Sequence, residues 1–376
     1  MNTTFQTQIM LVSDQAAPNL LPALDPTLKP EKAVLLVSSK MAKRADALEA
    51  VLREVGIKPS RVLLPDEHNL AALEEVMLQT GSELGTASVA VNLTGGTKLM
   101  ALTAQTIAQM AGWPSFYVDV DTDQIIWLDK NRPAQALTQQ LRLRHYLRGY
   151  GFQLSEGIER PQPNPAWQAL VTDLIQNIGS LEEAIGQLNY LSQEAQQTLV
   201  HTLRSRQSAN HHLDALLRKF EQAQVLKRKG EQVQFAHEAA RRFANGGWIE
   251  HHVYQAVCRV TGDLGIRDKA ANLQVTDASG QPNEMDVALM ARNRLFVIEC
   301  KTARMNNPDD TKANDTLYKL AENCKRIGGL GTRGMLASYR PLRPSEQRLA
   351  KVLQIEVVAG RELASLDDRL KSWIRP

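Results

Sequence analysis

Residues 283–301 read NEMDVALMARNRLFVIECK, and their pattern is the strongest indication of how the C-terminal part of the chain folds. It contains two strand-like segments that predict adjacent β-strands: 284–290 and 294–300. Side chains alternate between the two faces of a strand, so Glu299 and Lys301 project to the same side. We expect Asp286 to reach them from the neighbouring strand. Two carboxylates and an ammonium group at one point suit a divalent cation and an attacking water, which makes metal-dependent phosphodiester hydrolysis the leading hypothesis.

The donors in this stretch match what a hard divalent cation requires. Mg²⁺ prefers oxygen ligands and keeps several waters beside one or two carboxylates. We therefore predict Asp286, Glu299 and the backbone carbonyl of Cys300 as metal ligands. Lys301 is predicted either to orient or deprotonate the water or to neutralise charge on the phosphorus centre. The alternative is a Glu–Lys pair on the surface, but residues 295–300 are apolar on both faces apart from Glu299, which indicates a central strand.

Two further acidic residues are candidates for the same site. Glu250 ends the segment GGWIE (246–250) and lies in the first turn of a helix predicted from about Trp248 to Val260. It is predicted as a catalytic residue and further metal ligand; the alternative is that it only complements the helix dipole. Glu284 shares strand parity with Asp286 and is a secondary candidate. Three aromatic residues are either base-stacking or core residues: Trp248, Tyr254 and Tyr318.

These blocks resemble the active site of a known superfamily. The pattern Asp286…Glu299-Cys300-Lys301 resembles that of the PD-(D/E)xK restriction-endonuclease-like proteins, although Glu284-Met285 precede the aspartate where that superfamily has a proline. Together with GGWIE, the NEMD and IECKT blocks are similar to the CRISPR ancillary nucleases that carry an N-terminal CARF sensor domain. The resemblance implies a metal-dependent site made of four residues: Glu250, Asp286, Glu299 and Lys301.

The N-terminal part alternates between strand and helix patterns. Strands separated by helices of 10–15 residues predict a Rossmann-like α/β fold with a parallel sheet and right-handed crossovers. The predicted strands are Thr7–Val12, Ala33–Val37, Arg61–Leu64, Ser88–Leu93, Phe116–Val118 and Gln124–Leu128, and the predicted helices are 41–55, 67–79 and 97–111.

Polar loops follow three strands of this sheet. Ligands of open parallel sheets bind outside the carboxyl ends of the strands, and a glycine-rich turn before a helix favours an anion. We therefore predict a phosphate-rich ligand at Ser13, Asp14, Ser38, Ser39, Thr94, Gly95, Gly96, Thr97 and Lys98. The block NLTGGTK (92–98) is neither a Walker A loop nor a dinucleotide fingerprint. It resembles the ligand loop of CARF domains, which sense cyclic oligoadenylates made by type III CRISPR complexes.

The region between these parts is polar and mostly helical. Pro161, Pro163 and Pro165 predict a rigid linker. Residues 225–236, with Gly230 at the turn, predict a hairpin that with the preceding helices hints at a winged-helix-like element. Between Arg204 and Arg242, nine Lys/Arg stand against four Asp/Glu, which is either a solvated helical face or a phosphate-tracking surface.

Three domains are predicted along the chain. They are a CARF domain at 1–134, a helical linker region at 135–245 and a PD-(D/E)xK nuclease domain, also α/β, at 246–376, which suits a length of 376 residues.

Composition and charge limit the class of protein. The net charge of +3 is too small to argue for nucleic acid by itself. The three cysteines show no CxxC spacing, so neither a disulfide framework nor a zinc site is indicated. With no signal-peptide pattern and no apolar run of about 18 residues, the expectation is a cytoplasmic protein with no membrane partner.

The family resemblance implies a specific function. It implies a homodimer in which a cyclic oligoadenylate, expected to be cyclic tetra-adenylate, activates cleavage of single-stranded DNA or RNA with Mn²⁺ or Mg²⁺ as cofactor. The sequence does not decide whether the substrate is DNA or RNA, how many adenylates the activating ring contains, or whether the sensor domain degrades its ligand.

Two rival functions remain. One is a ligand-controlled transcription regulator whose C-terminal acids are structural. The other is a nucleotide-dependent metabolic enzyme, which the lack of GxGxxG disfavours.

Overall fold

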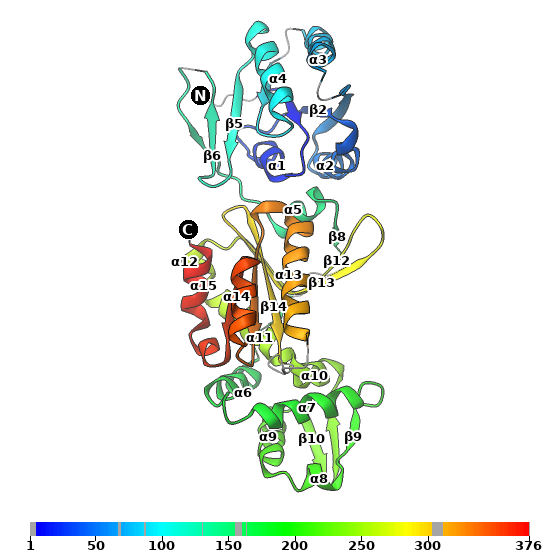
Figure 1. Ribbon diagram of the computed structural model, residues 1–376, viewed down its shortest axis with the longest axis vertical. Helices are drawn as coiled ribbons and strands as arrows, with labels where there is room; N and C mark the ends of the chain where they lie inside the picture. The colour runs from blue at the N-terminus through cyan, green and yellow to red at the C-terminus, as the bar shows by residue number, and fades with distance from the viewer. Residues whose placement is uncertain are drawn as a thin grey trace.

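The structure is a computed structural model that describes residues 5–66, 69–85, 88–129, 131–154, 160–162, 164–302 and 311–375. Three units are stacked along the long axis (Figure 1). The N-terminal domain lies at one end, the C-terminal domain in the centre, and the middle domain, drawn in green, at the other end.

The N-terminal domain is built on a seven-stranded sheet of order β3-β2-β1-β4-β5-β6-β7. The first five strands in this order are parallel, and each of the last two pairs antiparallel with the strand before it. Every residue of β1 is buried, as expected for the central strand. The strands are β1 (Thr7–Leu11), β2 (Lys32–Val37), β3 (Lys58–Leu63), β4 (Val89–Asn92), β5 (Ser115–Asp119), β6 (Gln124–Trp127) and β7 (Gln135–Ala136). The helices are α1 (Ala17–Leu24), η1 (Ser39–Met41), α2 (Ala42–Glu54), α3 (Leu70–Leu84) and α4 (Lys98–Met110).

The C-terminal domain has a six-stranded sheet of order β16-β15-β14-β13-β12-β8. Its strands are β8 (Gln153–Leu154), β12 (Asp268–Thr276), β13 (Pro282–Ala291), β14 (Arg294–Lys301), β15 (Arg333–Ser338) and β16 (Ile355–Ala359). Its helical elements are α5 (Leu143–Gly149), α11 (Trp248–Arg259), α12 (Thr261–Leu264), α13 (Lys312–Gly328), η3 (Gly329–Gly331), α14 (Pro344–Val352), η4 (Gly360–Ser365) and α15 (Leu366–Ile374). The two α/β domains confirm the predicted fold class.

The middle domain has the element order of a winged helix. Helix α7 is followed by β9, α8, α9 and then the β10–β11 hairpin, and the strands form an antiparallel sheet of order β10-β11-β9. The elements are α6 (Pro165–Gln176), α7 (Glu182–Glu194), β9 (Val200–Thr202), α8 (Ser205–Ser208), α9 (His211–Gln222), β10 (Leu226–Lys229), β11 (Gln232–Phe235), α10 (Glu238–Arg242) and η2 (Phe243–Gly247).

The predicted proline linker is wrong at its C-terminal end. Pro165 is the first residue of α6, where the missing N–H of a proline costs no hydrogen bond. The side chain of Asn164 caps this helix by accepting from the backbone N–H groups of Ala166 and Trp167. Pro163 lies outside the described residues.

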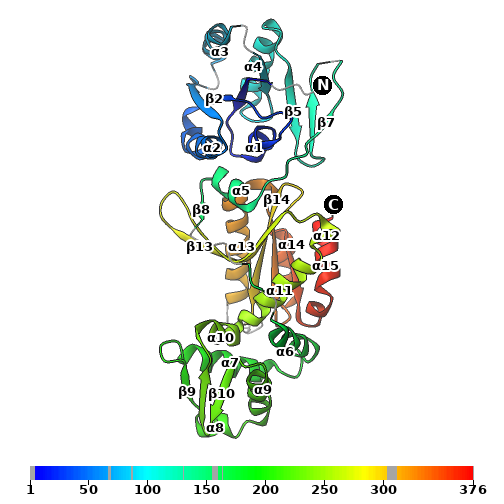
Figure 2. The same cartoon turned by 180° about the vertical axis from the view of Figure 1, so that it is seen from behind.

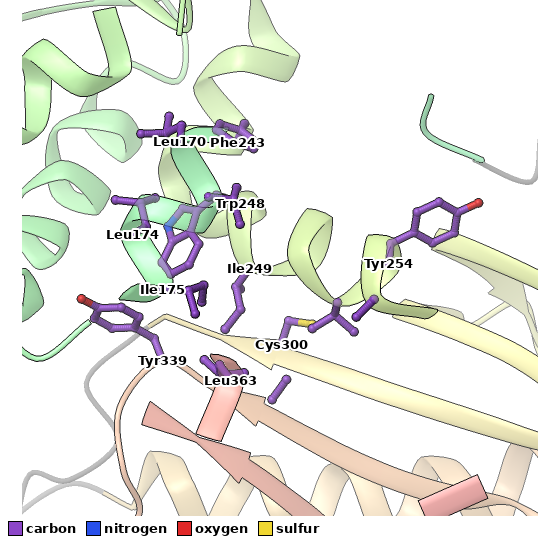
Figure 3. Close-up of a cluster of buried hydrophobic side chains, with 14 of the residues drawn as sticks. Leu170, Leu174, Ile175, Phe243, Trp248, Ile249, Tyr254, Cys300, Tyr339 and Leu363 are labelled. Atoms are coloured by element: carbon purple, nitrogen blue, oxygen red, sulfur yellow. The ribbon is translucent and has the colours of Figure 1, made fainter. Parts of the chain in front are cut away.

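A shared hydrophobic core joins the middle and C-terminal domains (Figure 3). Trp248, at the start of α11, packs edge-on against Tyr339, with ring centroids 5.3 Å apart. The hydroxyl of Tyr339 donates to the backbone carbonyl of Ile178, beyond α6. Trp248 and Tyr254 are 0% and 3% exposed, so of the two roles considered for them they are core residues. Tyr318 remains 54% exposed.

Within the described residues, no helix combines the length and the apolar character that crossing a bilayer requires.

Candidate functional sites

The two strands of the β13–β14 hairpin bring the acidic groups together. Their ladder ends at the pair Val287–Ile298. One residue beyond it, the carboxylate of Asp286 accepts a hydrogen bond from the backbone N–H of Cys300 at 2.7 Å. The side chain therefore takes the place of the next ladder bond and holds its carboxyl group against the end of β14.

Glu299 and Lys301 lie on one side of β14, as the strand period predicts. The ammonium nitrogen of Lys301 is 2.5 Å from a carboxylate oxygen of Glu299, and the two side chains are 33% and 24% exposed. Each remains accessible to a substrate. Cys300 is buried between them and burial raises the pKa of its thiol, so it has only backbone groups to offer to the site.

Electrostatics couples the four predicted catalytic residues. Burial, then the carboxylate of Glu299, raise the pKa of Asp286 to about 8. Burial, then Glu284, raise the pKa of Glu250. Burial alone lowers the pKa of Lys301, but the carboxylates of Glu299 and Asp286 outweigh it and raise that pKa to about 12. The site therefore has more negative charge than it can stabilise, and a lysine that keeps its proton at neutral pH.

A glycine just before α11 brings Glu250 to this site. Gly246 has a φ of +103°, and a Cβ there would lie 2.5 Å from the hydroxyl oxygen of Thr302, directly after β14. The backbone can therefore pass against the end of β14 before α11 begins, which places Glu250 in the first turn of that helix. The same hydroxyl accepts from the side-chain amide of Asn189 on α7 at 3.0 Å. Sequence reasoning missed Arg242, whose charge lowers the pKa of Glu250 and which precedes the glycines.

The donor set fits a divalent cation in part. Oxygen donors dominate, and a cation would remove the charge repulsion that raises the pKa of Asp286 and Glu250. Among the described residues, however, no three His, Cys, Asp or Glu side chains are arranged to hold a metal ion. Two carboxylates with a carbonyl and waters are the arrangement that the residues allow.

The N-terminal sheet reverses its strand order between β1 and β4, and the predicted ligand loops meet there. A Cβ on Gly95, in the loop after β4, would overlap the backbone carbonyl of Leu11 at the end of β1. Only glycine allows this approach. The loops after β1 and β4 are therefore in direct contact at this edge.

The structure divides the predicted ligand residues into two groups. The hydroxyl of Thr94 donates to Asn92 at 2.7 Å and accepts from the backbone N–H of Val118 at 2.8 Å, and the hydroxyl of Thr97 caps α4. Ser38 is buried, and Ser13 bonds with the backbone of Gln15. These hydroxyls serve the loops themselves. The side chains exposed at the edge are those of Asp14, Ser39 and Lys98, beside the partly exposed Gly96.

Sequence reasoning missed two residues at this edge. Arg44 of α2 contacts Asp14 at 3.3 Å and donates to the backbone carbonyl of Tyr150 at 2.8 Å. Asn92 is fully buried and orders the loop through Thr94. Arg44 could have been predicted as a residue of this edge, because it lies in the first turn of the helix that follows β2.

Comparisons with known proteins cover both α/β domains. The family model of the Card1 CARF domain matches residues 7–146, and that of the Card1-like endonuclease domain matches residues 237–376. Protein VC1899 from Vibrio cholerae is 26% identical, with a TM-score of 0.90, over 100% of this chain and 98% of that one. Can2 from Sulfobacillus thermosulfidooxidans, solved with cyclic tetra-adenylate, is 27% identical, with a TM-score of 0.79. The match covers 98% of this chain and 97% of that one.

A more distant structure shares the fold alone. It is described as a type III CRISPR defence DNA nuclease activated by cyclic oligoadenylate, and it is 19% identical, with a TM-score of 0.58. The match covers 90% of this chain and 47% of that one. No curated protein matches the chain. The chain belongs to the CARF-domain CRISPR ancillary nucleases, with a Card1 CARF domain followed by a Card1-like endonuclease domain.

Proposed function

We propose that this nuclease is activated by cyclic tetra-adenylate and cleaves single-stranded DNA or RNA with a divalent metal ion in type III CRISPR defence. The observation that carries the proposal is the meeting of Asp286, Glu299 and Lys301 at one end of the β13–β14 hairpin. A hydrolytic site needs carboxylates for a cation and a positive group for the phosphate, and these three supply both.

Each residue of the site has a proposed role. Asp286, Glu299 and the carbonyl of Cys300 would hold Mn²⁺ or Mg²⁺, and Glu250 would reach the ion through a bound water. The bound ion would activate water and polarise the phosphate. Lys301, whose pKa is raised to about 12, is suited to neutralising the charge that develops on phosphate oxygens rather than to accepting a proton.

The N-terminal edge would receive the activator. The loop at Gly95–Gly96 leads into the N-terminus of α4, where the helix dipole favours a phosphate. Lys98 is exposed beside it. The relative Can2 was solved with cyclic tetra-adenylate, which supports that ring as the activator here.

An exposed apolar face on α4 supports a homodimer. Leu99, Leu102 and Met110 are 37%, 65% and 71% exposed. They lie at helical spacing on the helix that begins at the ligand loop. A second copy packed on α4 would bring two ligand loops together about a two-fold axis, which matches a ring of even symmetry.

A cleavage assay tests this function. Wild-type protein with Mn²⁺ should cut a single-stranded oligonucleotide much faster when cyclic tetra-adenylate is added. Lys301→Ala should abolish cleavage, whereas the matched control Lys319→Ala, an exposed lysine on α13, should not. Equal rates with and without the ligand would refute ligand control. Full cleavage in EDTA would refute metal dependence.

A second function is a ligand-controlled transcription regulator, which the winged-helix element order favours. If the protein is such a regulator, wild type and Lys301→Ala should bind duplex DNA with equal affinity. Wild type should then not hydrolyse nucleic acid.

A further inference from the structure

We propose that the winged-helix unit, α7 to β11, binds duplex DNA through α9 and the β10–β11 wing. This surface is separate from the carboxylate site and would hold DNA whether or not the protein cleaves it. Its element order is that of proteins that lay one helix in the major groove and set a wing against the backbone.

Helix α9 presents a free face of suitable shape. Its inner side is fully buried through four residues: Leu213, Leu216, Leu217 and Phe220. The opposite side is exposed at four positions: His211, Ala215, Arg218 and Gln222. The small Ala215 lies between longer polar side chains, so the helix can approach a groove closely.

The basic residues of the β10–β11 wing fall into two groups: one fastens the wing to α9 and the others are exposed to solvent. Arg228 points inward, pairs with Asp214 of α9 at 2.7 Å, and its backbone N–H donates to Glu221 at 2.9 Å. These contacts fasten the wing to α9. Lys227 and Lys229, on the other face of β10, are exposed and have no ion-pair partner among the described residues.

The charge of this unit is complementary to DNA. Between Arg204 and Glu231 there are seven Lys/Arg against three Asp/Glu. Asp214 pairs with Arg218 and Arg228, and Lys219 pairs with Asp173 outside this span. Glu221 accepts from the backbone N–H of Arg228, and Glu231 accepts from Ser208. Lys227 and Lys229 form no ion pair among the described residues. The free charge is therefore positive, as phosphate contacts require. The contact between Asn189 and Thr302 fixes α7 beside the end of β14 that carries the catalytic residues. The middle domain lies on the side of the C-terminal domain opposite the N-terminal domain (Figure 2), so DNA bound to it would lie towards that end.

Binding of a labelled 30-base-pair duplex in EDTA tests the surface without cleavage. We expect Lys227→Glu/Lys229→Glu to weaken binding at least about tenfold and to reduce the slope of log K against log salt by about 2, since two phosphate contacts are lost. The control Lys32→Glu/Lys58→Glu makes the same charge change on exposed strand starts of the N-terminal domain and should have little effect. Ala215→Glu should also weaken binding.

Several outcomes would overturn this proposal. They are equal affinity of wild type and the wing variant, an equal loss in the control, and no duplex binding by wild type, which would leave a protein partner for the wing. Cleavage of a short single strand with Mn²⁺ and cyclic tetra-adenylate should be unchanged in the wing variant. A failure of wild-type cleavage would count against the proposed nuclease function only.

We also infer that the turn of the β13–β14 hairpin couples the ligand edge to the catalytic site, an inference that rests on the proposed ligand control. The side-chain amide of Asn293, in this turn, donates to Asp123 at 2.7 Å, and its oxygen accepts from the backbone N–H of Leu141 at 2.7 Å. The next residue, Arg294, forms an ion pair with Asp121. Asp121 and Asp123 lie in the turn between β5 and β6.

The ligand loop reaches the same turn through β5. Thr94, in the loop after β4, accepts the backbone N–H of Val118 on β5. A shift of this loop on ligand binding would therefore be passed to the β5–β6 turn and then to the turn of the hairpin. The hairpin carries Asp286 on one strand and Glu299 and Lys301 on the other, so the same rigid element contacts the sensor at its turn and forms the site at its far end.

Asn293→Gly separates coupling from folding. Asn293 has a φ of +55°, which glycine accepts without strain, so only the two side-chain contacts are lost. We expect unchanged cleavage without ligand, ligand affinity within about threefold of wild type, and activation reduced at least about fivefold. Asp123→Asn, which keeps an acceptor oxygen, should retain activation.

Full activation of Asn293→Gly would overturn the coupling role. A parallel loss of ligand binding or of ligand-free cleavage would also overturn it, because the defect would then lie in one site. Wild-type cleavage that ignores the ligand would refute ligand control itself, and the coupling with it.

Discussion

Replacing Asp286 by asparagine should stabilise the metal-free protein while it abolishes cleavage. The asparagine would keep an oxygen to accept from the backbone N–H of Cys300 but would carry no charge. The folded-state pKa of Asp286 is about 8 against an ordinary value of 3.8. Well below about pH 4 both states are protonated and the two proteins should be equally stable. As the pH rises towards 8, only the unfolded wild type releases this proton, so wild type loses stability relative to the variant.

The size of this effect follows from the pKa difference. About four pKa units correspond to a ceiling of about 6 kcal/mol at and above pH 8. Because the side chain is partly exposed, solvent and rearrangement reduce this, and we expect about 2 kcal/mol, or about 4–8 °C in the thermal transition.

Thermal unfolding in EDTA at pH 5, 6, 7, 8 and 9 measures the difference. Asp277→Asn is the matched control: the hydrogen bonds of Asp277 with Ser279 lower its pKa, so its loss should destabilise. A raised pKa of Asp286 would be contradicted if Asp286→Asn melts below wild type at pH 8, or if the gain in melting temperature does not grow with pH. Mn²⁺ should raise the melting temperature of wild type and leave the variant nearly unchanged.

Three further predictions concern single positions. Gly95→Ala should reduce cyclic tetra-adenylate affinity at least about tenfold by calorimetry, because the new methyl overlaps the carbonyl of Leu11, and should leave ligand-free cleavage unchanged; wild-type affinity would contradict the close approach. Leu102→Glu should convert a dimer to a monomer in light scattering, since the side chain is 65% exposed on the proposed interface; an unchanged mass would place the interface elsewhere. Cys300→Ala should cost about 1–2 kcal/mol of stability yet keep metal-dependent cleavage, because the buried thiol takes no part; loss of cleavage with an intact fold would assign it a role.

The catalytic hairpin was readable from the sequence because its pattern is local. The predicted strands 284–290 and 294–300 lie inside β13 and β14, and the two-residue period places Glu299 and Lys301 on one side. The bond from Cys300 to Asp286 was not readable, because it depends on register. Register is set by the turn at Arg292–Asn293, two left-handed residues without the glycine that would signal such a turn.

The ligand edge shows a different limit. Its loops were predicted from strand ends, but sequence cannot tell whether a hydroxyl is used by its own loop. Thr94 and Thr97 have backbone and side-chain partners within their loops. Helix α1 was also not predicted, because Pro22 lies inside it and an interior proline normally argues against a helix. The roles of the site residues and the domain bounds stay predictions.

The short strand β8 has a consequence for how this protein is assembled. Gln153 and Leu154 precede the middle domain in sequence but pair with Thr276 and Val275 of β12 in the C-terminal sheet. The nuclease module therefore begins before the winged helix and resumes after it. The winged helix is an insertion within a discontinuous nuclease domain, and because the two share one hydrophobic core, any replacement of the insert must preserve the packing around Trp248 and Tyr339.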